Sequence, residues 1–192
     1  MIEKIYEKII EISKKKYAFH FLILVAFLES FIFPIPPDLF LIILILANKS
    51  KAFTLALFCT ISSVLGGILG YLIGSIFFDT IGTNIINYYH LEDKFEIFKS
   101  YYNEFGVWIV GAGGFTPIPY KLITIFSGFV KLDILQFTAI SFISRGARFF
   151  LIALLLYFYG KKIETILIKR FGILTLIFFL LLILIYIILK YW

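Results

Sequence analysis

Five ionisable side chains stand within or at the edge of long apolar runs in this sequence: Glu29, Asp38, Lys121, Arg145 and Arg148. In lipid each such charge would cost about 3 kcal/mol or more unless it is paired or hydrated, so these residues are candidates for function. The planar fork of arginine matches phosphate oxygens, and a carboxylate in a low-dielectric cavity can take up a proton near neutral pH. The set therefore indicates binding of an anionic phosphate, with protons as candidate coupling ions.

The charges of this set do not balance. Three are cationic and two are anionic, so one positive charge is left for a bound phosphate. Arg145 and Arg148 are three residues apart, which places them on one face of a helix and lets both reach the same cavity. Structural alternatives stay open at this stage. An ion pair such as Glu29–Arg148 would hold helices together, Asp38 would serve as a helix N-cap, and Lys121 would reach an interface with its long side chain.

The apolar runs around these residues predict a membrane protein. Hydrophobic residues make up 61% of the chain and the mean hydropathy is +1.01, whereas a soluble domain is about half apolar. Residues 171–189 lack charge and proline and match the ~20 residues that cross a bilayer. The runs 54–78 and 134–159 are also long enough. A small-residue face for close helix packing is predicted in the first of them, at Gly66, Gly67, Gly70 and Gly74.

Two further apolar stretches, 17–47 and 107–130, are interrupted and predict re-entrant hairpins. Prolines mark their turns: Pro34, Pro36, Pro37, Pro117 and Pro119. Proline removes an amide donor and clashes with the preceding helical turn, so neither stretch forms one straight spanning helix. Each hairpin is followed by a long helix. This repetition predicts two inverted-topology repeats with the site at the breaks.

Charge distribution completes the expected topology. Residues 1–16 are amphipathic and predict an interfacial helix, and residues 79–104 are net acidic and aromatic, as expected of an interfacial segment on the outer face. Basic clusters flank the first hairpin and follow the run 134–159, which places those ends in the cytoplasm. The same rule explains the net charge of +6, so we expect no nucleic acid as partner. The fold class is an all-α polytopic membrane protein of a single domain.

Nothing in the sequence predicts catalysis. His20 and His90 are isolated, Cys59 has no obvious partner, and Ser62 and Ser63 lack a base nearby in sequence. The sequence contains no metal-ligand cluster and no phosphate-binding loop. We therefore expect no enzyme activity, no metal and no cofactor, although a carboxylate-based intramembrane hydrolase or transferase stays an alternative.

Four ordered motifs resemble the DedA (VTT-domain, or SNARE-associated Golgi protein-like) superfamily, in particular its YqaA-like bacterial branch. They are the stretch 29–38 (ESFIFPIPPD), the glycine-rich run 63–74, the stretch 116–121 (TPIPYK) and the stretch 145–150 (RGARFF). The resemblance covers nearly all of residues 17–160. It implies two opposed re-entrant hairpins in a multi-pass protein of the bacterial cytoplasmic (inner) membrane. It also implies phospholipid or lipid-carrier translocation, often coupled to the proton gradient, in which Glu29 and Asp38 matter.

The chain departs from the superfamily at one motif. Members tend to carry arginines on both sides of the second hairpin's proline, in an R-x-x-P-x-x-R pattern. Gly114 and Tyr120 occupy those positions around Pro117. Arg145 and Arg148 are expected to supply the positive charge from the neighbouring helix. Because of this departure, the lipid species is not carried over.

The sequence thus predicts a transport protein that flips or scrambles an anionic phospholipid or a polyprenyl-phosphate lipid, with protons as candidate coupling ions. A proton- or cation-coupled transporter of a small solute is the alternative. A membrane-organising protein without transport is a second alternative. Association into a homo-oligomer stays open.

Overall fold

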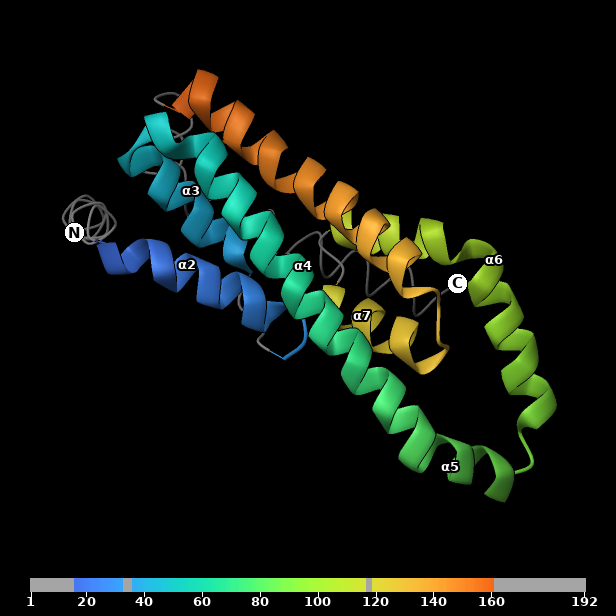
Figure 1. Ribbon diagram of the computed structural model, residues 1–192. Helices are drawn as coiled ribbons and strands as arrows, with labels where there is room; N and C mark the ends of the chain where they lie inside the picture. Colours follow the sequence, from blue (N-terminus) through green and yellow to red (C-terminus); the bar gives the residue numbers. More distant parts are fainter. Residues whose placement is uncertain (1–15, 33–35, 117–118, 161–192) are drawn as a thin grey trace, which may run out of the picture.

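The computed structural model describes residues 16–32, 36–116 and 119–160, and every regular element in these ranges is helical (Figure 1). The elements in chain order are α2 (Lys16–Glu29), α3 (Pro37–Ala47), the 3₁₀ turn η1 (Lys49–Lys51), α4 (Ala52–Phe77), the π-helical turn η2 (Phe78–Gly82), α5 (Thr83–Tyr88), α6 (Glu92–Phe115), α7 (Tyr120–Phe129) and the helix Ile134–Gly160. The all-α class is confirmed for the described residues. The expected segments 1–16 (apart from Lys16) and 171–189, together with Pro34 and Pro117, lie outside them.

Two helices are long and apolar enough to cross a membrane. One is the continuous helical stretch Lys49–Tyr88, and the other is Ile134–Gly160. They lie antiparallel along each other, the first in turquoise to green and the second in orange (Figure 1). The first is longer than the expected 54–78, because η2 continues the helix from α4 into α5 instead of ending it. A π-helical turn absorbs extra residues without breaking the hydrogen-bonded chain.

Both proline-containing stretches fold as a helix, a break and a second helix. The first break separates α2 from α3, and the second separates α6 from α7. Pro36 and Pro119 stand at the N-cap positions of α3 and α7, and Pro37 opens α3. The missing amide of a proline costs nothing there, because the first turn of a helix leaves its amides unpaired. The prolines therefore start new helices as well as ending the preceding ones.

The second unit is longer than the sequence indicated. The expectation was a surface segment over 79–104 and a hairpin beginning at 107, but α6 runs without interruption from Glu92 to Phe115. Glu92 and Asp93 lie in its first turn, where carboxylates favour the positive end of the helix dipole. No proline occurs between these ends. The change from polar to apolar residues near 107 therefore falls inside one helix.

Two apolar cores pack between the helices, one in each half of the molecule. The first joins α2, α3, α4 and the second half of the helix 134–160 through Leu22, Ala26, Leu41, Ile45, Ala56, Cys59, Phe149 and Ala153. The second joins α4, α6, α7 and the beginning of the helix 134–160 through Tyr71, Tyr102, Val110, Ile123, Val130 and Phe137. Both long helices therefore contribute to both cores and connect them.

The glycines of α4 let neighbouring helices approach its backbone. A Cβ atom on Gly66 would lie 2.1 Å from the carbonyl oxygen of Phe27 in α2, and one on Gly74 would lie 2.0 Å from that of Ile125 in α7. Real Cβ atoms do not come so close, so only glycine fits at these two crossings. The predicted small-residue face is confirmed as a packing face, and it holds both broken units against α4.

Candidate functional site

Buried polar side chains replace the apolar packing midway along α4 and midway along the helix Ile134–Gly160. We call this set, which includes the ion-paired side chains of Glu29, Asp38, Arg145 and Arg148, the central polar layer. Its hydroxyl-bearing members are at most 7% exposed: Ser30, Thr60, Ser62, Ser63, Thr124, Ser141 and Ser144. At ~1.5 Å per residue, Arg145 stands roughly 17 Å from the start of its helix and 22 Å from its end. The layer thus lies near the midpoint of a helix that is long enough to cross a bilayer core.

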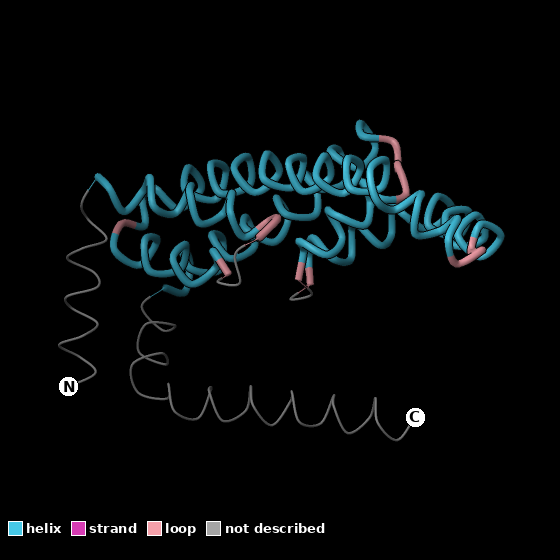
Figure 2. Tube along the Cα trace, turned by 90° about the horizontal axis from the view of Figure 1, so that it is seen from below, coloured by secondary structure: helices cyan, strands magenta, loops and turns pink. Residues whose placement is uncertain are grey.

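Both breaks meet at this layer. The helix ends that flank the two breaks lie next to each other in the middle of the molecule, as Figures 1 and 2 agree. The carbonyl oxygen of Ser30, directly after α2, accepts a hydrogen bond of 2.9 Å from Thr124 Oγ1 in α7. The ends of α2 and α6 and the beginnings of α3 and α7 therefore converge there.

Arg145 is the most deeply buried charge of the layer, with 2% of its side chain exposed. Its Nη2 donates to Glu29 Oε2 at 2.6 Å, and its Nε donates to Ser63 Oγ at 2.7 Å. The rings of Tyr120 and Phe149 lie with their centroids 4.8 Å from the guanidinium carbon. An ion pair, a charge-assisted hydrogen bond and two cation–π contacts hold this guanidinium in place.

Arg148 connects the two breaks. Its Nε and Nη2 donate to the two carboxylate oxygens of Asp38, at 3.1 and 2.5 Å, which is the bidentate geometry that arginine favours. Its Nη1 donates to the carbonyl oxygen of Thr116 at 2.5 Å, at the C-cap of α6. One side chain therefore links the first turn of α3 to the end of α6.

The layer and both breaks fall within residues 21–158, which match the family model of the VTT domain. The chain belongs to the VTT-domain family. Together with the two long apolar helices, this match indicates a membrane protein. The resemblance of the motifs to the DedA (VTT-domain) superfamily is thereby confirmed.

Two bacterial proteins are similar to this VTT-domain chain along most of its length. A protein of Haemophilus influenzae is 37% identical over 157 residues, covering 82% of this chain and 81% of its own. A protein of Histophilus somni is 33% identical over 158 residues, covering 82% of each chain. Both are described as uncharacterized. No solved structure matches the chain.

The VTT-domain chain arranges the five charged candidates as two ion pairs and one lysine. The pair raised from the sequence, Glu29–Arg148, is wrong: Glu29 pairs with Arg145, and Asp38 pairs with Arg148. Asp38 does not cap α3, whose N-cap is Pro36 without a side-chain hydrogen bond. Lys121, in the first turn of α7, is half-buried and forms no ion pair within the described ranges. Those ranges also contain no group of three His, Cys, Asp or Glu placed to hold a metal ion.

Sequence reasoning missed the hydroxyl groups of the layer. Ser63 Oγ lies 2.9 Å from Ser30 Oγ and also accepts from Arg145. Tyr120 Oη and Ser141 Oγ are both buried and interact with each other, outside the geometry of a regular hydrogen bond. Ser141 could have been predicted from the sequence, because it precedes Arg145 by four residues and so shares its helix face.

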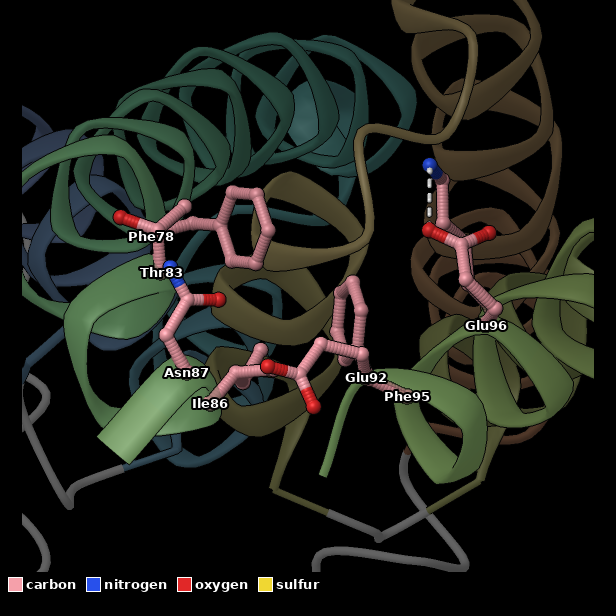
Figure 3. A pocket seen from close by; sticks show the side chains of 8 residues that line it. Phe78, Thr83, Ile86, Asn87, Glu92, Phe95 and Glu96 are labelled. Atoms are coloured by element: carbon pink, nitrogen blue, oxygen red, sulfur yellow. Dashed lines mark ion pairs between the residues drawn. The ribbon is translucent and has the colours of Figure 1, made fainter. Parts of the chain in front are cut away.

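A separate pocket of about 250 Å³ lies where η2, α5 and the start of α6 meet (Figure 3). It is lined by Phe78, Thr83, Ile86, Asn87, Glu92, Phe95, Glu96 and Lys99. The rings of Phe78 and Phe95 stack with centroids 5.0 Å apart, and Lys99 Nζ lies 3.7 Å from Glu96. None of the five charged candidates lines this pocket. It is therefore distinct from the central polar layer.

Proposed function

We propose that this VTT-domain protein moves an anionic lipid across the membrane, by flipping or scrambling, with the headgroup passing through the central polar layer. The observation that carries the proposal is the position of Arg145 and Arg148, midway along a helix long enough to cross a bilayer and at the meeting point of two broken helix pairs. Ionisable groups at such depth are expensive and mostly serve a pathway. Paired broken helices build the midplane sites of many transporters.

The chemistry of the layer suits a phosphate. Guanidinium groups offer paired donors that match phosphate oxygens, and the hydroxyls of Ser30 and Ser63 stand beside Arg145. The first turns of α3 and α7 have no side-chain cap. Their backbone amides add donors and a positive dipole end. Both a phospholipid and a polyprenyl phosphate carry such a group.

Carboxylates occupy both guanidinium groups in this structure, Glu29 on Arg145 and Asp38 on Arg148. A phosphate that binds an arginine therefore competes with a carboxylate for the same N–H donors. A proton on Glu29 removes its negative charge and weakens that competition, so proton uptake and headgroup binding favour each other. We propose this exchange as the route by which a proton gradient couples to lipid movement.

We place the protein in the bacterial cytoplasmic membrane with several crossings. Lys49 and Lys51 precede α4, and Lys49 contacts Gly160 at the end of the other long helix, where a Cβ atom would lie 2.7 Å from Lys49 Cε. Lys161 and Lys162 follow in the sequence. Lys49 and Lys51 therefore lie at the end of the two long helices after which Lys161 and Lys162 come in the sequence, and the positive-inside rule assigns that end to the cytoplasm.

The proposal is tested by reconstituting the full chain in liposomes and following the transbilayer movement of fluorescent phosphatidylglycerol and a polyprenyl phosphate. Wild type is expected to move at least one of them. Arg148→Ala is expected to lose that movement while remaining folded, and Glu29→Gln to lose the response of that movement to a proton gradient. Loss of thermal stability with unchanged movement per folded molecule would support the membrane-organising alternative. No movement of either lipid, together with pH-dependent solute uptake that Glu29→Gln abolishes, would support the solute transporter.

A further inference from the structure

The two ion pairs of the central polar layer differ in how the arginine binds its carboxylate. Arg148 donates through Nε and Nη2 to both oxygens of Asp38, at 3.1 and 2.5 Å. Arg145 donates to Glu29 Oε2 through Nη2 alone, at 2.6 Å, and Glu29 Oε1 forms no hydrogen bond within the described ranges. A bidentate contact is stronger and more specific in geometry than a single one. The Glu29–Arg145 pair therefore lacks one of the two hydrogen bonds that close the Asp38–Arg148 pair.

Ser63 accounts for this difference. Its Oγ accepts from Arg145 Nε at 2.7 Å, and so it occupies the donor that a bidentate pair with Glu29 would need. Ser30 Oγ donates its single hydrogen to the carbonyl oxygen of Ala26, at 3.0 Å. The hydrogen between the two serine oxygens, which lie 2.9 Å apart, therefore belongs to Ser63. Both serines are fully buried, so this chain of hydrogen bonds fixes Ser63 as an acceptor for Arg145.

This arrangement leaves Arg145 with an acceptor when Glu29 moves away. Only 2% of the Arg145 side chain is exposed, and a charge at that depth without any acceptor is strongly disfavoured. With Ser63 on Nε, the terminal nitrogens Nη1 and Nη2 remain as paired donors for phosphate oxygens. Arg148 uses three of its five N–H groups on Asp38 and a main-chain carbonyl, so it retains two for the same phosphate.

We infer that Ser63 is a positioning residue that makes the Glu29–Arg145 pair the one that opens to the headgroup, while the Asp38–Arg148 pair stays closed. The inference rests on the proposed function and concerns the regulation of the same site. Without the Ser63 hydroxyl, Arg145 Nε is free to donate to Glu29 Oε1. Glu29 then binds through both oxygens and excludes the phosphate. Loss of Ser63 therefore acts through the carboxylate of Glu29, and an uncharged side chain at position 29 relieves it.

The test measures the initial rate of lipid movement per folded molecule in vesicles containing the full chain, with the anionic lipid that wild type moves. Ser63→Ala is expected to slow the movement about tenfold, because a hydrogen bond to a charged group stabilises by that factor or more. The double variant Ser63→Ala with Glu29→Gln is expected to move lipid at about the rate of Glu29→Gln alone. A neutral amide competes weakly with phosphate whether or not Arg145 Nε is free.

Ser127→Ala is the matched control. Ser127 is as buried as Ser63 and lies 3.0 Å from Tyr102 Oη in the second core, so the substitution also removes a buried hydroxyl contact. It is expected to lower thermal stability and leave the rate per folded molecule near that of wild type. Ser63→Cys keeps the side-chain volume and supplies only a weak acceptor. It replaces Ser63→Ala in both comparisons if the alanine variant does not fold.

Two results would overturn the inference while leaving the proposed function in place. One is movement at the wild-type rate in a folded Ser63 variant. The other is a slowed Ser63 variant that Glu29→Gln does not restore, which would make Ser63 a support of the fold and nothing more. If wild type moves neither phosphatidylglycerol nor the polyprenyl phosphate, the proposed function fails and the inference fails with it.

Discussion

Arg145 and Arg148 are both paired, but their surroundings differ. Arg145 is enclosed by Glu29, Ser63 and two aromatic rings, whereas Arg148 also holds a main-chain carbonyl, that of Thr116. Removing one partner of a buried ion pair strands the other charge, which costs about 3 to 5 kcal/mol. A single substitution therefore removes a contact that stabilises the fold and a candidate functional group at the same time.

The contribution of the Arg145–Glu29 pair to the fold gives a first prediction for stability. Arg145→Met alone leaves the Glu29 carboxylate without its partner and should lower the free energy of unfolding by about 3 kcal/mol. Adding Glu29→Gln removes the stranded charge and should recover most of that loss. Thermal unfolding of the purified protein in detergent measures both effects. A single variant as stable as wild type would show that the pair contributes little to the fold.

The buried hydroxyl of Tyr120 gives a second prediction. Tyr120→Phe keeps the ring against Arg145 and removes a buried hydroxyl whose interaction with Ser141 lacks regular hydrogen-bond geometry, so the free energy of unfolding should change by no more than about 1 kcal/mol. Tyr120→Leu also removes the cation–π contact and should be less stable than the Phe variant by at least about 1 kcal/mol. Thermal unfolding of the two purified variants in detergent measures this difference in stability. If the two variants are equally destabilised, the contact of the ring with Arg145 contributes nothing to stability.

At this scale the sequence predicted which charges lie between the helices of the two ion pairs but not how they pair. Their identity follows from composition, because a charge in an apolar run is visible in the sequence. Their pairing depends on the register between α2, α3 and the helix 134–160, which no local pattern reveals. The hydroxyls of Ser30 and Ser63 were missed for the same reason, since their partners are distant in sequence.

At the scale of elements, close helix crossings hold the two broken units in place. The crossing of α7 over α4 leaves no room for a Cβ atom at Gly74, because the obstacle is backbone rather than a flexible side chain. At Gly111 in α6, by contrast, a Cβ atom would meet only Ile140 Cγ2, at an ordinary distance of 3.7 Å. The two glycines thus form a matched pair for substitution.

We expect Gly74→Ala to lower the free energy of unfolding by about 1 to 3 kcal/mol, because α7 must move away from α4. Gly111→Ala should instead be neutral or raise it by up to about 1 kcal/mol, because alanine restricts the unfolded chain and favours a helix. Denaturant unfolding of both variants measures the difference. Equal effects in the two would mean that the α4–α7 crossing is looser than described.

The breaks were predictable from sequence and the helix boundaries were not. Proline acts locally by geometry, so Pro36, Pro37 and Pro119 mark helix starts wherever the chain lies. A change of polarity does not restrict the backbone angles, so α6 continues across the boundary expected near 107. Likewise, no sequence pattern predicts the π-helical turn η2.

At the scale of the whole molecule, the central polar layer separates two apolar cores. Two antiparallel long helices cross all three regions, so the layer stands at a depth where water is scarce if the helices span a bilayer. The all-α class and the family followed from composition and motifs. The inverted repeat and the re-entrant hairpins stay predictions, because membrane position and topology depend on the lipid around the chain.

The most direct test removes the charges of Asp38 and Arg148 together. Asp38→Asn with Arg148→Gln strands no charge, so the double variant should fold with a melting temperature close to that of wild type. The measurement is the initial rate of phosphatidylglycerol movement across reconstituted vesicles. Our account predicts a fall of about tenfold or more in the folded double variant, because the guanidinium that receives the phosphate is gone. Movement at the wild-type rate would contradict it, and would assign this pair to holding the breaks together and nothing more.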